Sequence, residues 1–386
     1  MRKILLIMFV VGHTALTAQT PMNLDSLLRL LPGAKEDTSK ALLFIHIGQQ
    51  YEGTNLDSAA YYYLQCKSLS NKLDYTKGKI KFITNFTFVL NQKSLLDSSL
   101  RLNLESVALA LTYGDRRTLA ACLSNVGSSY FYLNRLDSAA KYYLEALEIA
   151  TALQDEVLLM QTTQHLGLIY SDLKQYEKAI AMLDKTVVAA RAQNNPVFLS
   201  VALLNQGMVF NYLRQFDKAI LALDESQRIA EVAGDDFTQA HALLNLGHQY
   251  LATSQFKKPK ANFLKALSIS RKMQLKELAA ITLRSLGTYY FFQEQTDSAF
   301  YYAHQSLRLC LELKLLDETG KGYKLLSDVA QQTRDYKDMN MYSNKADSVE
   351  NLIQLEAVAG RIAELNTKYE SEIKENQIEL QKAAIR

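Results

Sequence analysis

Few side chains in this sequence have the types and spacing that chemistry would need. His241 and His248 are seven residues apart, so on a helix they would share one face, and imidazole nitrogens can hold a metal ion. Metal ligands paired on a helix usually stand three or four residues apart, and no cysteine or carboxylate nearby completes a set. We therefore expect no metal and no other cofactor.

The usual signatures of catalysis are also missing. Cys66, Cys122 and Cys310 lie far apart without a CxxC or Cys/His spacing, and we interpret them as small core residues. The sequence has no HExxH, no GxSxG, no phosphate-binding GxxxxGK[ST] loop and no GxGxxG. Its acidic residues recur at regular intervals instead of forming a cluster. These observations predict a protein that is not an enzyme.

Composition indicates an almost wholly helical protein. The chain has 386 residues, of which 48% are hydrophobic and 22% charged, with only 15 glycines and 4 prolines. That is enough apolar material for a large core, and too few turn residues for a chain of many short strands. Lys and Arg total 43 against 40 for Asp and Glu, without a dense basic block, so nucleic acid is not an expected partner.

The N-terminus has the three-part layout of a secretory signal peptide. Arg2 and Lys3 precede the apolar run 4–11, and a small and polar stretch, 12–20, follows. We expect a signal peptide at 1–18 and an exported, periplasmic protein. The alternative is that the segment is retained and tethers the chain to the membrane. A membrane is an expected partner only in that case, or if a membrane span is encoded downstream.

A 40-residue repeat organises the rest of the chain. The segment 136–140 has a near copy at 56–60, two steps of 40 earlier, and an acidic column recurs at the same step. Eight repeats fit, with three further columns. They hold glycine at Gly127, Gly167, Gly207, Gly247 and Gly287, tyrosine at Tyr130, Tyr170, Tyr250 and Tyr290, and alanine at Ala139, Ala179, Ala219 and Ala299.

These columns are typical of two packed helices in each repeat. Glycine inside a helix costs about 1 kcal/mol relative to alanine, so its recurrence predicts a place where a neighbouring helix comes too close for a side chain. Asparagines recur just before the glycine column, and we expect them to form hydrogen bonds between repeats. They are Asn85, Asn125, Asn205 and Asn245.

Glycine, tyrosine three residues later, then alanine and an aromatic residue form a pattern that resembles the tetratricopeptide repeat. Gly127, Tyr130, Ala139 and Tyr143 show it in full. The resemblance implies an all-α protein, a right-handed α-solenoid of about eight 40-residue helix pairs with a C-terminal capping or coiled-coil helix. It also implies a concave groove, lined by the first helix of each pair, in which a protein or peptide binds.

By the same resemblance, nine residues are candidates for the groove: Phe131, Tyr132, Tyr212, His241, His248, Arg284, Phe291, Phe292 and Lys321. Aromatic rings beside cationic groups would suit a peptide with apolar side chains and a carboxylate. The alternative is that these rings only fill the seams between repeats.

The expected organisation has four parts: the signal peptide at 1–18, a lead-in or cap at 19–39, the eight-repeat solenoid at 40–354, and a long helix at 355–386. In the last part Leu355, Val358, Ile362, Leu365 and Tyr369 alternate at spacings of three and four. That spacing is typical of a coiled-coil seam. The segment either caps the last repeat or forms a homodimer with a second copy.

Signal segment, repeats and charged tail together resemble the exported sensor region of Bacteroidetes-type sensor histidine kinases that contain tetratricopeptide repeats, without the kinase part. The resemblance implies a non-catalytic protein- or peptide-binding region, the periplasmic sensor of a two-component receptor. No kinase motif or further apolar span occurs in the sequence. The alternative is a free-standing exported scaffold or adaptor that mediates protein interactions.

Overall fold

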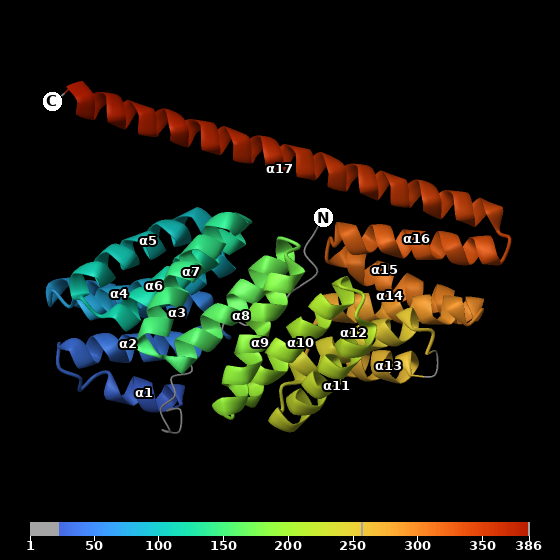
Figure 1. Ribbon diagram of the computed structural model, residues 1–386, viewed down its shortest axis with the longest axis horizontal. Helices are drawn as coiled ribbons and strands as arrows, with labels where there is room; N and C mark the ends of the chain where they lie inside the picture. The colour runs from blue at the N-terminus through green and yellow to red at the C-terminus, as the bar shows by residue number, and fades with distance from the viewer. Residues whose placement is uncertain (1–22, 256–257, 385–386) are drawn as a thin grey trace. The chain divides into compact units, whose positions relative to one another are not determined.

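The computed structural model describes residues 23–255 and 258–384, and every regular element within them is an α-helix (Figure 1). A short helix, α1 (Leu24–Leu30), precedes the repeats. The signal peptide predicted at 1–18 lies outside the described residues.

Sixteen further helices form eight pairs with a step of 40 residues. The first helices of the pairs are α2 (Thr38–Tyr51), α4 (Thr76–Gln92), α6 (Arg116–Tyr132), α8 (Glu156–Asp172), α10 (Pro196–Tyr212), α12 (Asp236–Ala252), α14 (Lys276–Phe292) and α16 (Leu316–Gln332). The second helices are α3 (Leu56–Lys72), α5 (Leu96–Tyr113), α7 (Leu136–Leu153), α9 (Tyr176–Ala192), α11 (Phe216–Ala233), α13 (Pro259–Lys272), α15 (Thr296–Glu312) and α17 (Tyr336–Ala384). The predicted all-α class, an array of 40-residue helix pairs, is confirmed.

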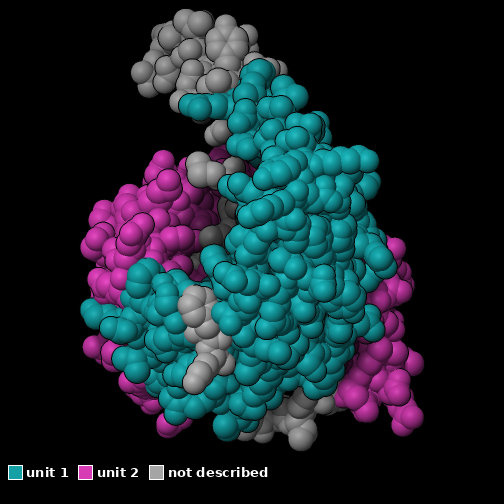
Figure 2. Space-filling view, turned by 90° about the vertical axis from the view of Figure 1, so that its right-hand side faces the viewer, with its two compact units in different colours: residues 1–2, 216–386 teal, residues 3–215 magenta. Residues whose placement is uncertain are grey.

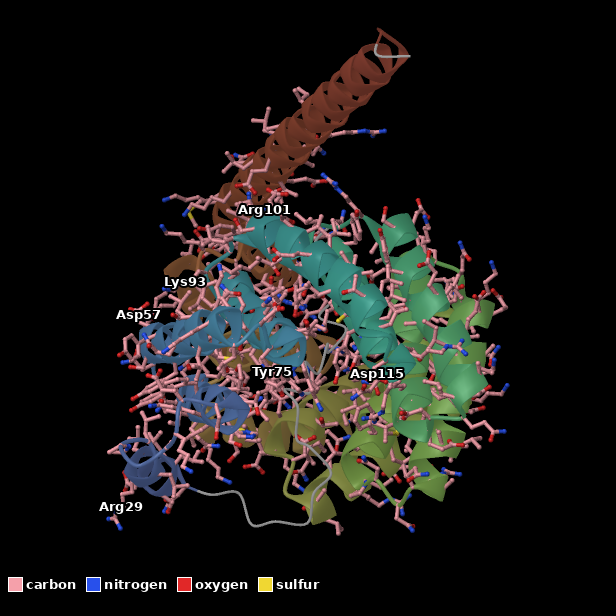
Figure 3. All side chains as sticks on the ribbon, turned by 90° about the vertical axis from the view of Figure 1, so that its left-hand side faces the viewer. Arg29, Asp57, Tyr75, Lys93, Arg101 and Asp115 are labelled. Carbon is pink, nitrogen blue, oxygen red and sulfur yellow. The ribbon has the colours of Figure 1, made fainter. Side chains whose placement is uncertain are left out.

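The chain divides into two compact units, one ending at Gln215 and the other beginning at Phe216. The first contains α1 to α10 and the second α11 to α17 (Figure 2). Within each unit, every helix packs on the next one along the chain. Exposed ion pairs add links between repeats, as between Lys93 and Asp57 at 2.6 Å (Figure 3). Such exposed pairs contribute little free energy each, so packing carries the array.

The turns between helices repeat every 20 residues. From residue 74 to residue 334, each turn places one residue in the left-handed region, with φ between 47° and 78°. Only Gly114 and Gly234 are glycines there. At thirteen of these fourteen turns, the amide of the following residue donates to the carbonyl five residues before it, as Gln175 does to Tyr170 at 2.8 Å. This bond satisfies a carbonyl that the helix end would leave unpaired.

The non-glycine residues at these turns carry backbone strain that glycine would relieve. Lys174 is exposed and has φ 58°. We expect Lys174→Gly to raise the free energy of unfolding by about 0.5–1 kcal/mol, measured by urea denaturation, because a left-handed conformation costs a side chain more than it costs glycine. Gly234→Ala, at φ 70°, should lower it by a similar amount. Equal stability of both variants and the parent chain would contradict this account.

The glycine column accommodates a large side chain of the paired helix. A Cβ atom added at Gly127 would lie 2.7 Å from the Tyr143 ring, and one at Gly167 would lie 2.7 Å from Leu183. At Gly287 the neighbours include the α15 backbone, with the Ala303 nitrogen 3.2 Å away. The neighbour is therefore helix backbone at some positions, as predicted, and a bulky side chain at others.

Helix α17 continues the second helix of the last repeat without a break. It has 49 residues, where the other second helices have 14 to 18. The boundary predicted at residue 355 falls inside it, so the eighth repeat and the tail share one helix (Figure 1). Gly360, where an added Cβ would meet nothing within 4 Å, does not interrupt the helix.

Candidate functional site

The first helices form the more closely spaced layer of each unit. In one unit, α2 contacts α4, and α8 contacts both α6 and α10. In the other unit, α14 contacts both α12 and α16. Among the described residues, second helices of neighbouring repeats make no comparable contact. A stack whose one layer is tighter than the other curves toward the tighter layer. We therefore place the candidate groove on the free face of the first helices.

A polar residue recurs at the same position of the first helices in both units. The position holds Asn85, Asn125, His165 and Asn205 in one unit, and Asn245 and Ser285 in the other. We call it the polar column. Only some members make the expected bonds between repeats: Asn85 Oδ1 accepts from Gln49 Nε2 at 2.8 Å. The Asn245 amide instead donates to the His241 carbonyl of its own helix at 2.9 Å.

Two members of the polar column have buried polar atoms without a hydrogen-bond partner in the described part of the chain. They are Nδ1 of His165 and both amide atoms of Asn205. The His165 ring lies 5.0 Å from the Tyr143 ring, and burial lowers its pKa to about 4. A buried polar group left unpaired costs about 1–3 kcal/mol. Asn205 has no exposed surface, whereas His165 is half-buried, so of the two only His165 presents surface to a ligand.

His248 links two first helices through the polar column. The Ser285 hydroxyl donates its proton to the Ile281 carbonyl at 2.9 Å, so His248 Nε2 is the donor in its 2.7 Å bond with that hydroxyl. Burial lowers the pKa of His248 to about 4, and the positive charge of Arg284 acts in the same direction. The ring is therefore neutral at pH 7. Burial likewise lowers the pKa of His241 to about 4.

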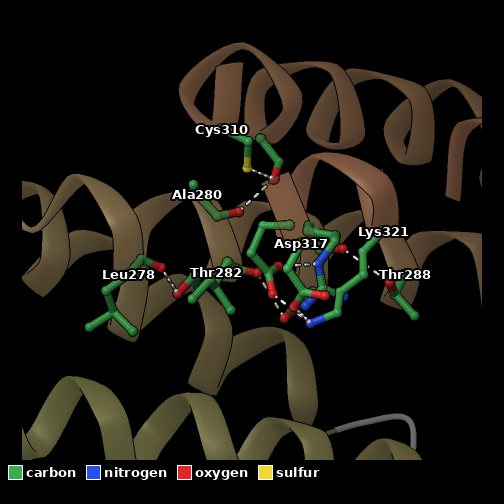
Figure 4. Close-up of polar contacts among 12 residues, drawn as sticks. Leu278, Ala280, Thr282, Thr288, Cys310, Asp317 and Lys321 are labelled. Atoms are coloured by element: carbon green, nitrogen blue, oxygen red, sulfur yellow. Dashed lines mark hydrogen bonds and ion pairs between the residues drawn. The ribbon is translucent and has the colours of Figure 1, made fainter. Parts of the chain in front are cut away.

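A network of charges joins α14 to α16. Arg284 Nε lies 2.8 Å from a Glu318 carboxylate oxygen, and Lys321 Nζ lies 2.7 Å from carboxylate oxygens of both Glu318 and Asp317 (Figure 4). Burial opposes the charged form of Glu318, but Arg284 and Lys321 outweigh it and lower its pKa below the ordinary value. The two cations predicted for the groove thus already have carboxylate partners, and they would exchange or share them with an acidic ligand.

The predicted aromatic residues divide between seam and surface. Phe131 is buried with Ala139 and Tyr143, and Tyr132 lies half-buried beside it. Phe291 packs partly buried on the core of its unit. Phe131 and Phe291 therefore fill space between packed helices, as the alternative interpretation of the sequence predicts.

Two predicted rings present surface that a ligand could reach. Tyr212 stacks on Tyr176 with ring centroids 5.2 Å apart, and its ring remains partly exposed. Phe292 is 56% exposed beside Phe291. These two rings, rather than Phe131, are the available aromatic anchors of the candidate groove.

Sequence reasoning missed His165 and Glu318 as members of the site. The signal for His165 was available, because it stands in step with the asparagines 40 residues on either side. Glu318 gave no such signal, since its pairing with Arg284 depends on how α14 and α16 pack.

One cavity opens beside α11, α12 and α13, away from the polar column. Its volume is about 290 Å³, and Asp224, Tyr250 and Lys258 are among its lining residues. Helix α13 is described from Pro259, whereas α11 and α15 begin at Phe216 and Thr296. The Lys258 ammonium lies 4.8 Å above the Tyr250 ring.

Two stretches of the chain match family models, both described as tetratricopeptide repeat, over residues 119–153 and 163–187. The first stretch covers most of α6 and all of α7, and the second runs from α8 into α9. No curated protein sequence is detectably similar to the chain.

Solved structures share the fold of this array of helix pairs at low sequence identity. The apo form of RapI is 15% identical, with a TM-score of 0.65 over 86% of this chain and 92% of RapI. The apo quorum sensor NprR from B. thuringiensis is 14% identical, with a TM-score of 0.63 over 85% and 97%. A Rap protein complexed with Competence and Sporulation Factor is 13% identical, with a TM-score of 0.61 over 86% and 92%.

The described residues contain neither a candidate membrane span nor a candidate metal-binding cluster. No helix there combines the length and apolar character needed to cross a membrane. No group of three or more His, Cys, Asp or Glu side chains lies close enough together there to hold a metal ion.

Proposed function

We propose that the first-helix face binds an extended segment of a peptide or protein, and that the chain acts as the exported sensory region of a signalling receptor. The polar column carries this proposal. Amide and imidazole groups at one position per repeat can pair with backbone groups along an extended chain, whatever its side chains. Such pairing would contribute most at His165, which is half-buried and whose Nδ1 has no hydrogen-bond partner among the described residues.

The neighbouring charges and rings indicate what side chains would suit the groove. Arg284 and Lys321 can bind an acidic side chain or a terminal carboxylate, and Phe292 offers an exposed ring for an apolar one. The fold shared with the quorum sensor NprR, and with a Rap protein solved with Competence and Sporulation Factor, supports a sensory array that binds a peptide-like ligand.

Peptides selected from a random display library test the groove. We expect Asn125→Ala or Asn245→Ala to weaken binding of the selected peptides at least tenfold, because each asparagine is half-buried on a first helix and belongs to the polar column. Asn262→Ala is the matched control, since Asn262 is a similarly half-buried asparagine on the second helix α13. Affinities unchanged in both first-helix variants, measured by calorimetry, would refute the groove.

Export and signalling need separate measurements. We expect the mature N-terminus, sequenced from a periplasmic fraction, to begin after residue 18, because residues 2–11 have the charge and apolar run of a signal peptide. The DNA beyond the codon for Arg386 distinguishes a sensor from a free-standing scaffold. An in-frame run of about 20 apolar codons followed by an output domain would support the receptor. An immediate stop codon would favour the scaffold.

A further inference from the structure

Helix α17 has two apolar faces. Tyr342 and Val349 are 8% and 9% exposed, and α17 packs on α16 through the part of the helix that contains them. A second set consists of Leu355, Val358 and Ile362, which are 67%, 57% and 54% exposed. We call this second set the outer stripe.

The outer stripe faces away from the repeats. Val358 follows Val349 by nine residues, which at 3.6 residues per turn is about two and a half turns, so the two side chains point in opposite directions. Packing of α17 on α16 cannot bury the outer stripe, because the stripe lies on the opposite face of the helix from Val349. The tail is therefore more than a cap for the last repeat.

The spacing of the outer stripe indicates a helix as its partner. Leu355, Val358 and Ile362 follow one another by three and four residues, and the sequence continues the alternation at Leu365 and Tyr369. An average step of 3.5 residues keeps an apolar seam facing one partner helix along a left-handed supercoil. A flat protein surface or a peptide strand does not impose this step.

We propose that the partner is the outer stripe of a second copy of this chain, in a parallel and in-register coiled coil. Pairing with itself in register places each aliphatic residue opposite its own copy. An antiparallel pair centred on Gly360 would instead oppose Leu355 to Leu365 and Val358 to Ile362. Five seam side chains per chain, each burying roughly 90 Å², would remove roughly 900 Å² from water, near the lower limit for specific interfaces.

Sedimentation equilibrium of the full chain tests the dimer. We expect the mass of two chains for the parent at micromolar concentration, and of one chain for Leu355→Glu combined with Ile362→Glu, because like charges would face each other across the seam. Ala357→Glu is the control. Ala357 is exposed, but it follows Val349 by eight residues, or about 2.2 turns, and so lies closer to the Val349 side of the helix than to the outer stripe. A monomeric parent, or a dimer that survives the double substitution, would overturn the proposal.

Cysteine cross-linking tests the orientation. The native Cys66, Cys122 and Cys310 are buried, so an engineered cysteine on α17 would be the exposed thiol. In a parallel in-register pair, Leu355→Cys and Ile362→Cys should each form an interchain disulfide on mild oxidation, with at least tenfold less from Ala357→Cys. Cross-linking at only one of the two stripe positions would show an antiparallel or shifted pair. Equal helix content by circular dichroism would confirm that the variants fold.

Discussion

Replacing Gly247 with alanine is expected to destabilise the protein by about 1–3 kcal/mol, even though alanine favours a helix over glycine by about 1 kcal/mol. A Cβ atom at this position would lie 2.6 and 2.7 Å from Cδ1 and Cζ of Phe263. Phe263 is fully buried, so its ring has nowhere to move. The steric cost of the contact with Phe263 therefore outweighs the higher helix propensity of alanine.

A double-mutant cycle separates crowding from any other cause. Phe263→Leu alone should cost about 1–2 kcal/mol for lost packing, but it should make Gly247→Ala nearly free or favourable, because the space beside Gly247 opens. Gly360→Ala is the matched control, since Gly360 is exposed and an added Cβ meets nothing within 4 Å. That change should add about 0.5–1 kcal/mol to the stability of its helix. Urea unfolding midpoints that show additive effects of the first pair would contradict the packing account.

Lowering the pH from 7 to 5 is expected to reduce the free energy of unfolding by about 2 kcal/mol for each of three histidines. Burial lowers the pKa of His165, His241 and His248 to about 4, from an ordinary value near 6.5. In this interval the unfolded chain therefore takes up protons that the folded chain does not. The stability contributed by the neutral rings is fully present above about pH 6.5, and it is lost as the pH falls toward 4.

Denaturation at several pH values checks the histidine effect. His165→Gln should remove about a third of the loss between pH 7 and 5, because glutamine keeps a polar group there but does not titrate. This interval lies above the titration of most carboxylates, so Glu318, whose pKa is lowered, adds its own loss only below it. Stability that stays constant from pH 7 to 5 would show that these rings bind protons equally in both states.

Part of the candidate site was predictable and part was not. Repetition every 40 residues predicted which residues share a position, and the resemblance to the tetratricopeptide repeat placed Arg284 and Lys321 in one proposed groove. It could not show that Glu318 already pairs with both, because that depends on the distance between α14 and α16. It also could not show that Phe131 is buried while Phe292 is 56% exposed, because burial depends on contacts between helices.

The sequence by itself determined the helical class, the repeat length and the number of helix pairs, because apolar and small residues recur with a period that local geometry fixes. The tertiary structure alone decided what each small residue accommodates, which polar groups are left unpaired and which face of α17 stays open. Those properties depend on side chains far apart in the chain meeting at distances below 4 Å. A local pattern can predict that a helix has two faces, but only packing determines which of them the repeats cover.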